Sequence, residues 1–137
     1  MTAVNNGAAL LGRVLLALIF VLAGFQKLFD FAGTIGYMEA EGLPLPTLAA
    51  IVAILVECVG GILVIAGYQT RLVGIVLAAW CIATALVGHR DFANLDQMIH
   101  LLKNVAMAGG FLQLFAFGAG GWSIDARQSG GVAKTVA

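Results

Sequence analysis

Four long apolar stretches make up most of this chain, and they constrain its fold more than any other feature. They cover approximately residues 8–29, 46–67, 72–88 and 98–117. An α-helix needs about 20 mostly apolar residues to cross the hydrocarbon core of a bilayer, and each stretch is close to that length. Charged residues make up only 10% of the 137 residues, against roughly 25% in soluble domains. The sequence therefore predicts an all-α integral membrane protein, a four-helix bundle surrounded by the lipid bilayer.

The connections between these stretches differ in length and in character. The link between the second and third stretches is tight, so those two helices are expected to be antiparallel neighbours. The longest connection contains "DFAGTIGYMEAEGLP", which predicts a short helix at the membrane interface. Asp30 would cap that helix, Gly42 would end it and Pro44 follows. We expect one transmembrane domain over residues 1–127 and a disordered tail over 128–137, which is rich in glycine and polar residues.

Four spans place both termini on one side of the membrane. The terminal side then carries four cationic residues, Arg13, Arg71, Arg127 and Lys134, and the opposite side carries three, Lys27, Arg90 and Lys103. The positive-inside rule favours cytoplasmic termini on this narrow margin, with Arg13 snorkelling to the inner interface. The formal net charge is zero, so no basic surface for nucleic acid is expected.

Small residues recur along the predicted helices at positions suited to close packing. In the first helix Arg13, Ala17, Phe20, Gly24 and Lys27 are spaced 4-3-4-3, the 3.5-residue period of a left-handed bundle. Similar sets follow in the other three helices: Ala49, Ala50, Ala53, Glu57, Gly60 and Gly61; Gly74, Ala78, Cys81 and Ala85; and Ala106, Gly109 and Gly110. Lipid does not drive helices together, so we expect these faces to be the contact surfaces.

Ionisable residues inside three of the helices are the strongest functional signal. Such residues are costly in lipid and usually face the interior of the bundle, where they pair. Lys27 lies 14 residues beyond Arg13, about 21 Å along the helix axis. Glu57 lies 11 residues after Pro46, about 16 Å from the outer end of its helix. Lys103 enters the fourth helix from the same side, so both ammonium groups are expected to approach Glu57 and to favour its ionised form.

Two interpretations of this constellation remain open. The first is a structural network of charges that fixes which helices pack together. The second is a polar pocket in the outer half of the membrane that binds a small polar or quinone-like headgroup. In that pocket Glu57 is the candidate catalytic residue and would exchange a proton. The candidate substrate-binding residues are Gln26, Lys27, Lys103, Asn104 and His100.

Other candidate sites carry weaker signals. His89 and His100 fall near the same membrane face and are candidate axial haem ligands, but helix-end histidines that face water are the commoner alternative. Trp80 is expected to face lipid or to pack rather than to stack on a cofactor. Cys58 and Cys81 lie in apolar runs without a CxxC spacing, so they predict packing residues and not a redox or metal site.

An ordered set of motifs resembles the DoxX family of bacterial inner-membrane proteins from about Gly12 to Asp125. The matching stretches are "GRVLLALIFVLAGFQKLFDFAGTIGYMEAEGLPLP", "VECVGGILVIAGYQTRL" and "KNVAMAGGFLQLFAFGAGGWSID". The family pattern falls on Gly24, Lys27, Gly42, Pro44, Glu57, Gly60, Gly61, Lys103, Asn104 and Asp125, with His89 where such proteins often carry a histidine.

The resemblance implies a four-helix protein of the bacterial inner membrane. Relatives include the DoxD-type subunit of a thiosulfate:quinone oxidoreductase, so the resemblance implies a redox-associated subunit with a redox enzyme partner and a quinone as candidate ligand. No haem, iron–sulfur or flavin motif is present, no metal site is expected, and the sequence leaves open whether the chain is catalytic. The alternatives are a non-catalytic scaffold and a small permease, which would need a homo-oligomer to alternate access.

Overall fold

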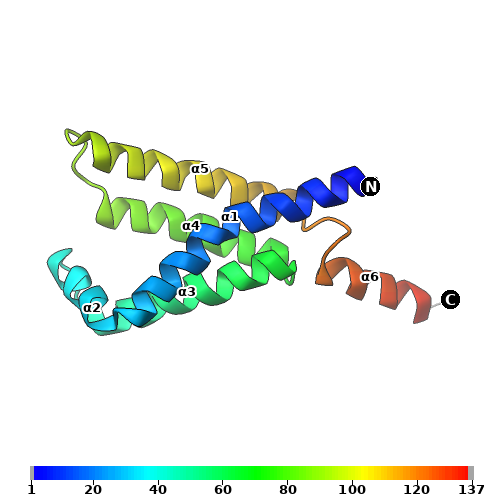
Figure 1. Cartoon of the computed structure of the whole chain (residues 1–137), viewed down its shortest axis with the longest axis horizontal. Helices are drawn as coiled ribbons and strands as arrows, with labels where there is room; N and C mark the ends of the chain where they lie inside the picture. The colour runs from blue at the N-terminus through cyan, green and yellow to red at the C-terminus, as the bar shows by residue number, and fades with distance from the viewer. Residues whose placement is uncertain (1, 136–137) are drawn as a thin grey trace.

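The computed structural model describes residues 2–135, and none of them forms a β-strand. The helices are α1 (Ala3–Phe29), α2 (Phe31–Ala40), α3 (Pro46–Ala66), α4 (Thr70–Gly88), α5 (Leu95–Phe117) and α6 (Ile124–Thr135). Four of them, α1, α3, α4 and α5, are long and apolar enough to cross a membrane. The predicted all-α membrane fold with four spans is therefore confirmed (Figure 1).

Local capping explains where these helices begin and end. The hydroxyl of Thr2 accepts a hydrogen bond from the backbone of Asn5, which starts α1 five residues before the predicted span. The Asp30 carboxylate accepts from Gly33 N–H at 3.1 Å, so the predicted cap of α2 is confirmed. Gly42 follows α2 with a positive φ of 76°, a conformation that favours glycine. The short helix between the first two spans is present, and its place at the membrane interface stays a prediction.

The four spans form two close pairs, α1 with α3 and α4 with α5. A Cβ atom on Gly24 would lie 2.5 Å from the sulfur of Cys58, so only glycine allows α1 to approach α3 this closely. A Cβ atom on Gly74 would lie 2.9 Å from the carbonyl oxygen of Phe111, so α4 and α5 are equally close. The pairs diverge toward the end of the bundle that carries α2 (Figure 1).

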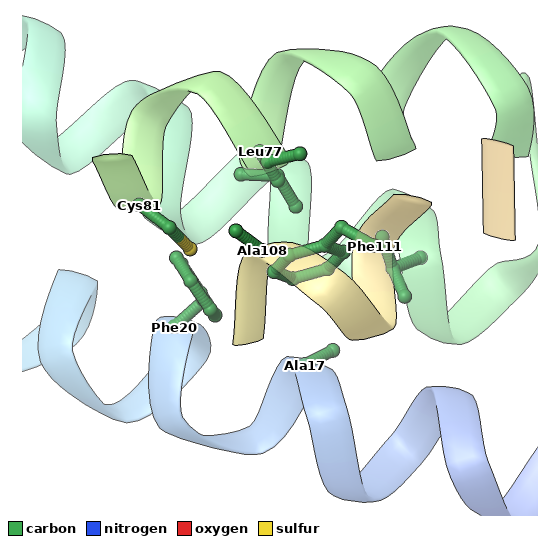
Figure 2. Packing of buried hydrophobic residues seen from close by; sticks show 8 residues of the cluster. Ala17, Phe20, Leu77, Cys81, Ala108 and Phe111 are labelled. Carbon is green, nitrogen blue, oxygen red and sulfur yellow. The ribbon is translucent and has the colours of Figure 1, made fainter. Parts of the chain in front are cut away.

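The larger of two apolar clusters joins the two pairs. Figure 2 shows side chains from α1, α4 and α5 converging, with the ring of Phe20 edge-on to Phe111 at 5.1 Å between centroids. The buried residues of α1 are Arg13, Ala17, Phe20 and Gly24, which confirms the predicted stripe on that helix.

The predicted contact face of the fourth span is only partly confirmed. A Cβ atom on Gly110 would lie 3.2 Å from the side chain of Leu16, so α5 approaches α1 there. Ala106 and Gly109 are exposed, and the buried residues of α5 are Ala108 and Phe111. The reason is that a bulky aromatic ring, and not the row of small residues, fills the space between the pairs. The face of α5 that carries Gly109 has open space around it instead.

Arg13 does not snorkel to the interface as the sequence suggested. Its side chain is 1% exposed and donates hydrogen bonds to the carbonyls of Val64, Ile65 and Trp122. The last carbonyls of a helix lack partners within the helix, so the guanidinium satisfies the end of α3 and ties it to α1. The expected snorkelling fails because three carbonyl acceptors are available inside the protein.

The C-terminal segment docks on the same end of the bundle. The carboxylate of Asp125 accepts from the backbone N–H groups of Gln69 and Thr70 at 2.8 and 2.9 Å, which caps α4. Ser123 caps α6 by accepting from Ala126 at 3.1 Å. Where the sequence favours a disordered tail over 128–137, the structure has α6 as far as Thr135, because this cap and the docking of Asp125 initiate a helix. Residues 136 and 137 lie outside the described part.

Candidate functional site

Two predicted site residues meet directly between α1 and α3. The ammonium nitrogen of Lys27 lies 2.7 Å from Glu57 Oε2. The close approach at Gly24 makes this contact possible, because Lys27 follows Gly24 by about one turn and Glu57 adjoins Cys58. The Glu57 side chain is 9% exposed and that of Lys27 is 27% exposed. The carboxylate is thus held inside the bundle with its charge matched.

A tryptophan completes the surroundings of the carboxylate. The indole Nε1–H of Trp80, on α4, donates to Glu57 Oε1 at 3.3 Å. Each oxygen of Glu57 therefore accepts one hydrogen bond, and the donors come from two different helices. The expectation that Trp80 only packs or faces lipid missed this contact. The signal available in the sequence was its spacing from Thr84 and Val87, which puts all three on one face of α4.

The Lys27–Glu57–Trp80 cluster lies in the wall of a cavity of about 690 Å³ between the diverging helix pairs. Each helix contributes one face at helical spacing, such as Trp80, Thr84 and Val87 from α4 and His100, Asn104 and Met107 from α5. The rest of the wall is mostly apolar: Ile19, Phe20, Ala23, Met38, Leu43, Pro44, Leu45, Leu48, Ala49, Val52, Ala53, Ala83 and Gly88. A large apolar cavity with a few convergent polar groups is typical of small-molecule sites.

A second polar group, which we call the rim, lies where α4 ends and α5 begins. Lys103 and Asn104 line the cavity here together with His89 and His100. Lys103 Nζ lies 3.0 Å from His100 Nδ1. An ammonium only donates, so Nδ1 is the acceptor in this contact, and Nε2 faces Asp96 Oδ2 at 3.7 Å.

The predicted approach of Lys103 to Glu57 is wrong. Trp80 stands about nine residues before His89 along α4, which is about 13 Å of helix. Lys103 belongs to the His89 end, where it contacts His100, and only Lys27 pairs with the carboxylate among the described residues. The amide nitrogen of Asn104 donates to the carbonyl of His100 in its own helix at 3.1 Å.

Gln26 lies away from the cavity. Its side chain is exposed and lines a shallow groove formed entirely by α1, together with Leu15, Leu18, Ile19, Leu22 and Ala23. The adjacent Lys27 faces the cavity instead because successive residues on a helix point about 100° apart. Of the six predicted site residues, the structure places five on the cavity wall and Gln26 outside it.

The two histidines contact each other. The rings of His89 and His100 stack with centroids 5.1 Å apart and planes 19° from parallel. Two rings packed face to face leave no space between them for a porphyrin, so this geometry does not fit a pair of axial haem ligands. Within residues 2–135, no group of three or more His, Cys, Asp or Glu side chains is arranged to hold a metal ion.

Tyr37 brings α2 into the site. It lines the cavity, and its hydroxyl oxygen would lie 2.9 Å from a Cβ atom on Gly88, so α2 meets the end of α4 closely. Burial raises the pKa of the Tyr37 hydroxyl, and the carboxylate of Glu41 raises it further. The hydroxyl therefore remains protonated at neutral pH, with the Glu41 carboxylate beside it as an acceptor. Sequence reasoning missed this residue because α2 lies outside the four spans.

Comparisons with known proteins agree with this architecture. The DoxX family profile matches residues 8–90. The inner membrane protein YphA of Escherichia coli (strain K12) is 38% identical over 86% of this chain and 88% of its own length. The inner membrane protein YqjF of the same organism is 35% identical over 91% of this chain and 95% of its own length.

A third relative covers less of the chain. It is "Putative oxidoreductase CatD" of Bacillus subtilis (strain 168), 39% identical over 50% of each chain. No solved structure matches the chain at a significant level. The family profile covers more than half of the sequence, and two relatives match it over most of their length. The chain therefore belongs to the DoxX family.

Proposed function

We propose that this protein is a redox-associated subunit of the bacterial inner membrane that binds a quinone or a similar small lipophilic molecule between its two helix pairs. The observation that carries the proposal is the cavity of about 690 Å³, whose apolar walls meet the Lys27–Glu57–Trp80 cluster. That volume falls within the range of roughly 300–1,000 Å³ typical of ligand pockets. We propose further that both termini are cytoplasmic.

Lys27 is the residue best suited to hold a carbonyl oxygen. An ammonium has three N–H donors, and one of them is used by Glu57. The side chain lines the cavity and is partly exposed, so its remaining donors are available to an acceptor on a ligand. Phe20, Met38 and Met107 supply apolar surface for the ring and the first part of a tail.

Glu57 is the proposed proton-exchanging group. Reduction of a quinone to a quinol takes up two electrons and two protons. In this proposal the residues of this chain orient the headgroup and exchange protons, and a redox enzyme partner supplies the electrons. The description of CatD as an oxidoreductase supports an association with redox chemistry.

One observation favours the alternative of a non-catalytic scaffold. The ion pair of Lys27 and Glu57 is direct, and Trp80 occupies the second carboxylate oxygen. Such a network fixes helix packing by itself and requires no ligand. The ligand-binding and scaffold functions predict different results when the charge of Lys27 or Glu57 is removed: the scaffold function predicts a loss of folding, and the ligand-binding function predicts a loss of binding.

The experiment compares Lys27→Met and Glu57→Gln in nanodiscs, with Gln26→Leu as a matched control outside the cavity. Folded yield and thermal midpoint are measured together with equilibrium binding of decyl-ubiquinone. The proposal predicts folded variants at 27 and 57 whose Kd rises at least tenfold, with Gln26→Leu unchanged. If the wild type does not bind and both variants lose folded yield, the scaffold function replaces the proposal.

A further inference from the structure

Trp80 occupies a position that no other described residue shares. It packs against both apolar clusters, the central one with Phe20 and Phe111 and the smaller one with Met38, Ala50 and Ala53. It is half-buried and lines the cavity. Its side chain therefore lies where the two helix pairs begin to diverge.

The polar atom of Trp80 has one defined role. An indole nitrogen is a donor only, so the contact of 3.3 Å fixes Oε1 of Glu57 as its acceptor. Lys27 then takes Oε2 at 2.7 Å. A carboxylate held at both oxygens from α1 and α4 cannot rotate freely about its last bond, so Trp80 determines which way the carboxylate plane faces the cavity.

We propose that Trp80 is a positioning residue for Glu57 and that its indole ring is the wall against which a planar conjugated ring of the ligand stacks. The ligand class is then a flat ring bearing a carbonyl oxygen, which accepts from Lys27 while its face lies on the indole. The ligand half of this inference rests on the proposed function. The positioning half rests on the hydrogen bond alone.

Stacking between flat rings has a measurable consequence. An aromatic pair contributes beyond the area it buries, so loss of the indole face weakens binding of a planar ring roughly two- to tenfold. A saturated, puckered ring of the same polarity gains little from a flat wall. The ratio of the Kd values for decyl-benzoquinone and the matching decyl-cyclohexanedione therefore measures directly how much stacking on the indole of Trp80 contributes to binding.

The positioning half is tested without any ligand. Trp80 and Trp122 are the two tryptophans of the chain, so Trp122→Phe leaves Trp80 as the only indole. The ultraviolet resonance Raman band that reports hydrogen bonding of the indole N–H is recorded in this background with Glu57→Leu and Glu57→Gln. We expect a shift toward the free N–H in Glu57→Leu and a smaller shift in Glu57→Gln, which keeps an acceptor oxygen. An unchanged band in Glu57→Leu overturns the positioning role.

The ligand half is tested by calorimetric Kd values for the two decyl compounds. Trp80→Phe keeps a flat face, and Trp80→Leu removes it. We expect the planar-ring preference to persist in Trp80→Phe and to disappear in Trp80→Leu. If the preference survives in Trp80→Leu, or is absent from the wild type, the proposal that the ligand ring stacks on Trp80 is overturned. A Raman shift without quinone binding overturns the proposed function and leaves the positioning role standing.

Discussion

Replacement of Gly24 by alanine tests the close contact between α1 and α3. The added Cβ would lie 2.5 Å from the sulfur of Cys58 and 2.9 Å from its backbone nitrogen. The sulfur can rotate away, but the nitrogen belongs to the backbone of α3. Restoring an ordinary contact of 3.4 Å moves the helices apart by about 0.5 Å. Overpacking of this kind costs about 1–3 kcal/mol.

A matched control separates this clash from the change in helix propensity. Alanine is favoured over glycine by about 1 kcal/mol inside a helix, and Gly109→Ala gains this term at a site with no atom within 4 Å of the new Cβ. We therefore expect Gly24→Ala to be less stable than Gly109→Ala by about 1–3 kcal/mol, which is roughly a 5- to 150-fold change in the folding equilibrium.

The assay is equilibrium unfolding in mixed micelles titrated with SDS, followed by circular dichroism. The same separation would weaken the ion pair one turn away, so the two variants should also differ in decyl-ubiquinone affinity if the cavity binds it. Equal unfolding free energies for Gly24→Ala and Gly109→Ala would refute the close packing of α1 on α3.

Three further predictions follow from other contacts. Arg13→Lys keeps the charge but not the fork that reaches three carbonyls, so we expect it to lower the unfolding free energy by about 1–3 kcal/mol; an unchanged value contradicts this. Burial raises the pKa of Asp125, but hydrogen bonds from Thr70 and Gln69 and the charge of Arg13 outweigh burial and lower it overall. Its stabilisation is therefore present above the unfolded carboxyl pKa of about 3.9 and is lost as pH falls through the folded value. Between pH 6 and pH 3 the thermal midpoint of the wild type should fall more than that of Asp125→Asn, and parallel curves would contradict the assignment. Lys103→Met should leave stability within about 0.5 kcal/mol, because Lys103 is exposed and the hydrogen bond of its ammonium is to the neighbouring His100; a larger loss in the same SDS titration would contradict this.

Helix content and much of the packing were predictable from the sequence because both follow from local patterns. Apolar stretches of membrane length predict the spans, and the 3.5-residue stripe on α1 identifies its buried face. Asp30 and Gly42 mark the ends of α2 by capping chemistry that depends on neighbouring residues alone. The pairing of Lys27 with Glu57 was predictable from depth, since both residues lie at compatible distances from the ends of their helices.

The features that the sequence did not predict depend on how helices from distant parts of the chain pack against one another. The sequence places Lys103 and Lys27 at similar depths in the membrane. Because the helix pairs diverge, however, the ammonium of Lys103 contacts His100 and not Glu57. Arg13 finds carbonyl acceptors that only the end of α3 and the C-terminal segment provide. Trp80 was missed because a tryptophan in an apolar helix suits lipid, packing or a polar contact equally well, and the carboxylate that selects among them comes from another helix.

The measurement that tests the central claim most directly is photoaffinity labelling with an azido-benzoquinone carrying a decyl tail, followed by mass spectrometry. We predict labels that decrease when excess decyl-ubiquinone competes, at the residues of α3 and α4 that line the cavity: Leu48, Ala49, Val52, Ala53 and Glu57, and Trp80, Ala83, Thr84, Val87 and Gly88. Labels confined to exposed positions such as Leu22 and Leu55, or labels that the competitor does not reduce, would contradict a quinone site between the helix pairs.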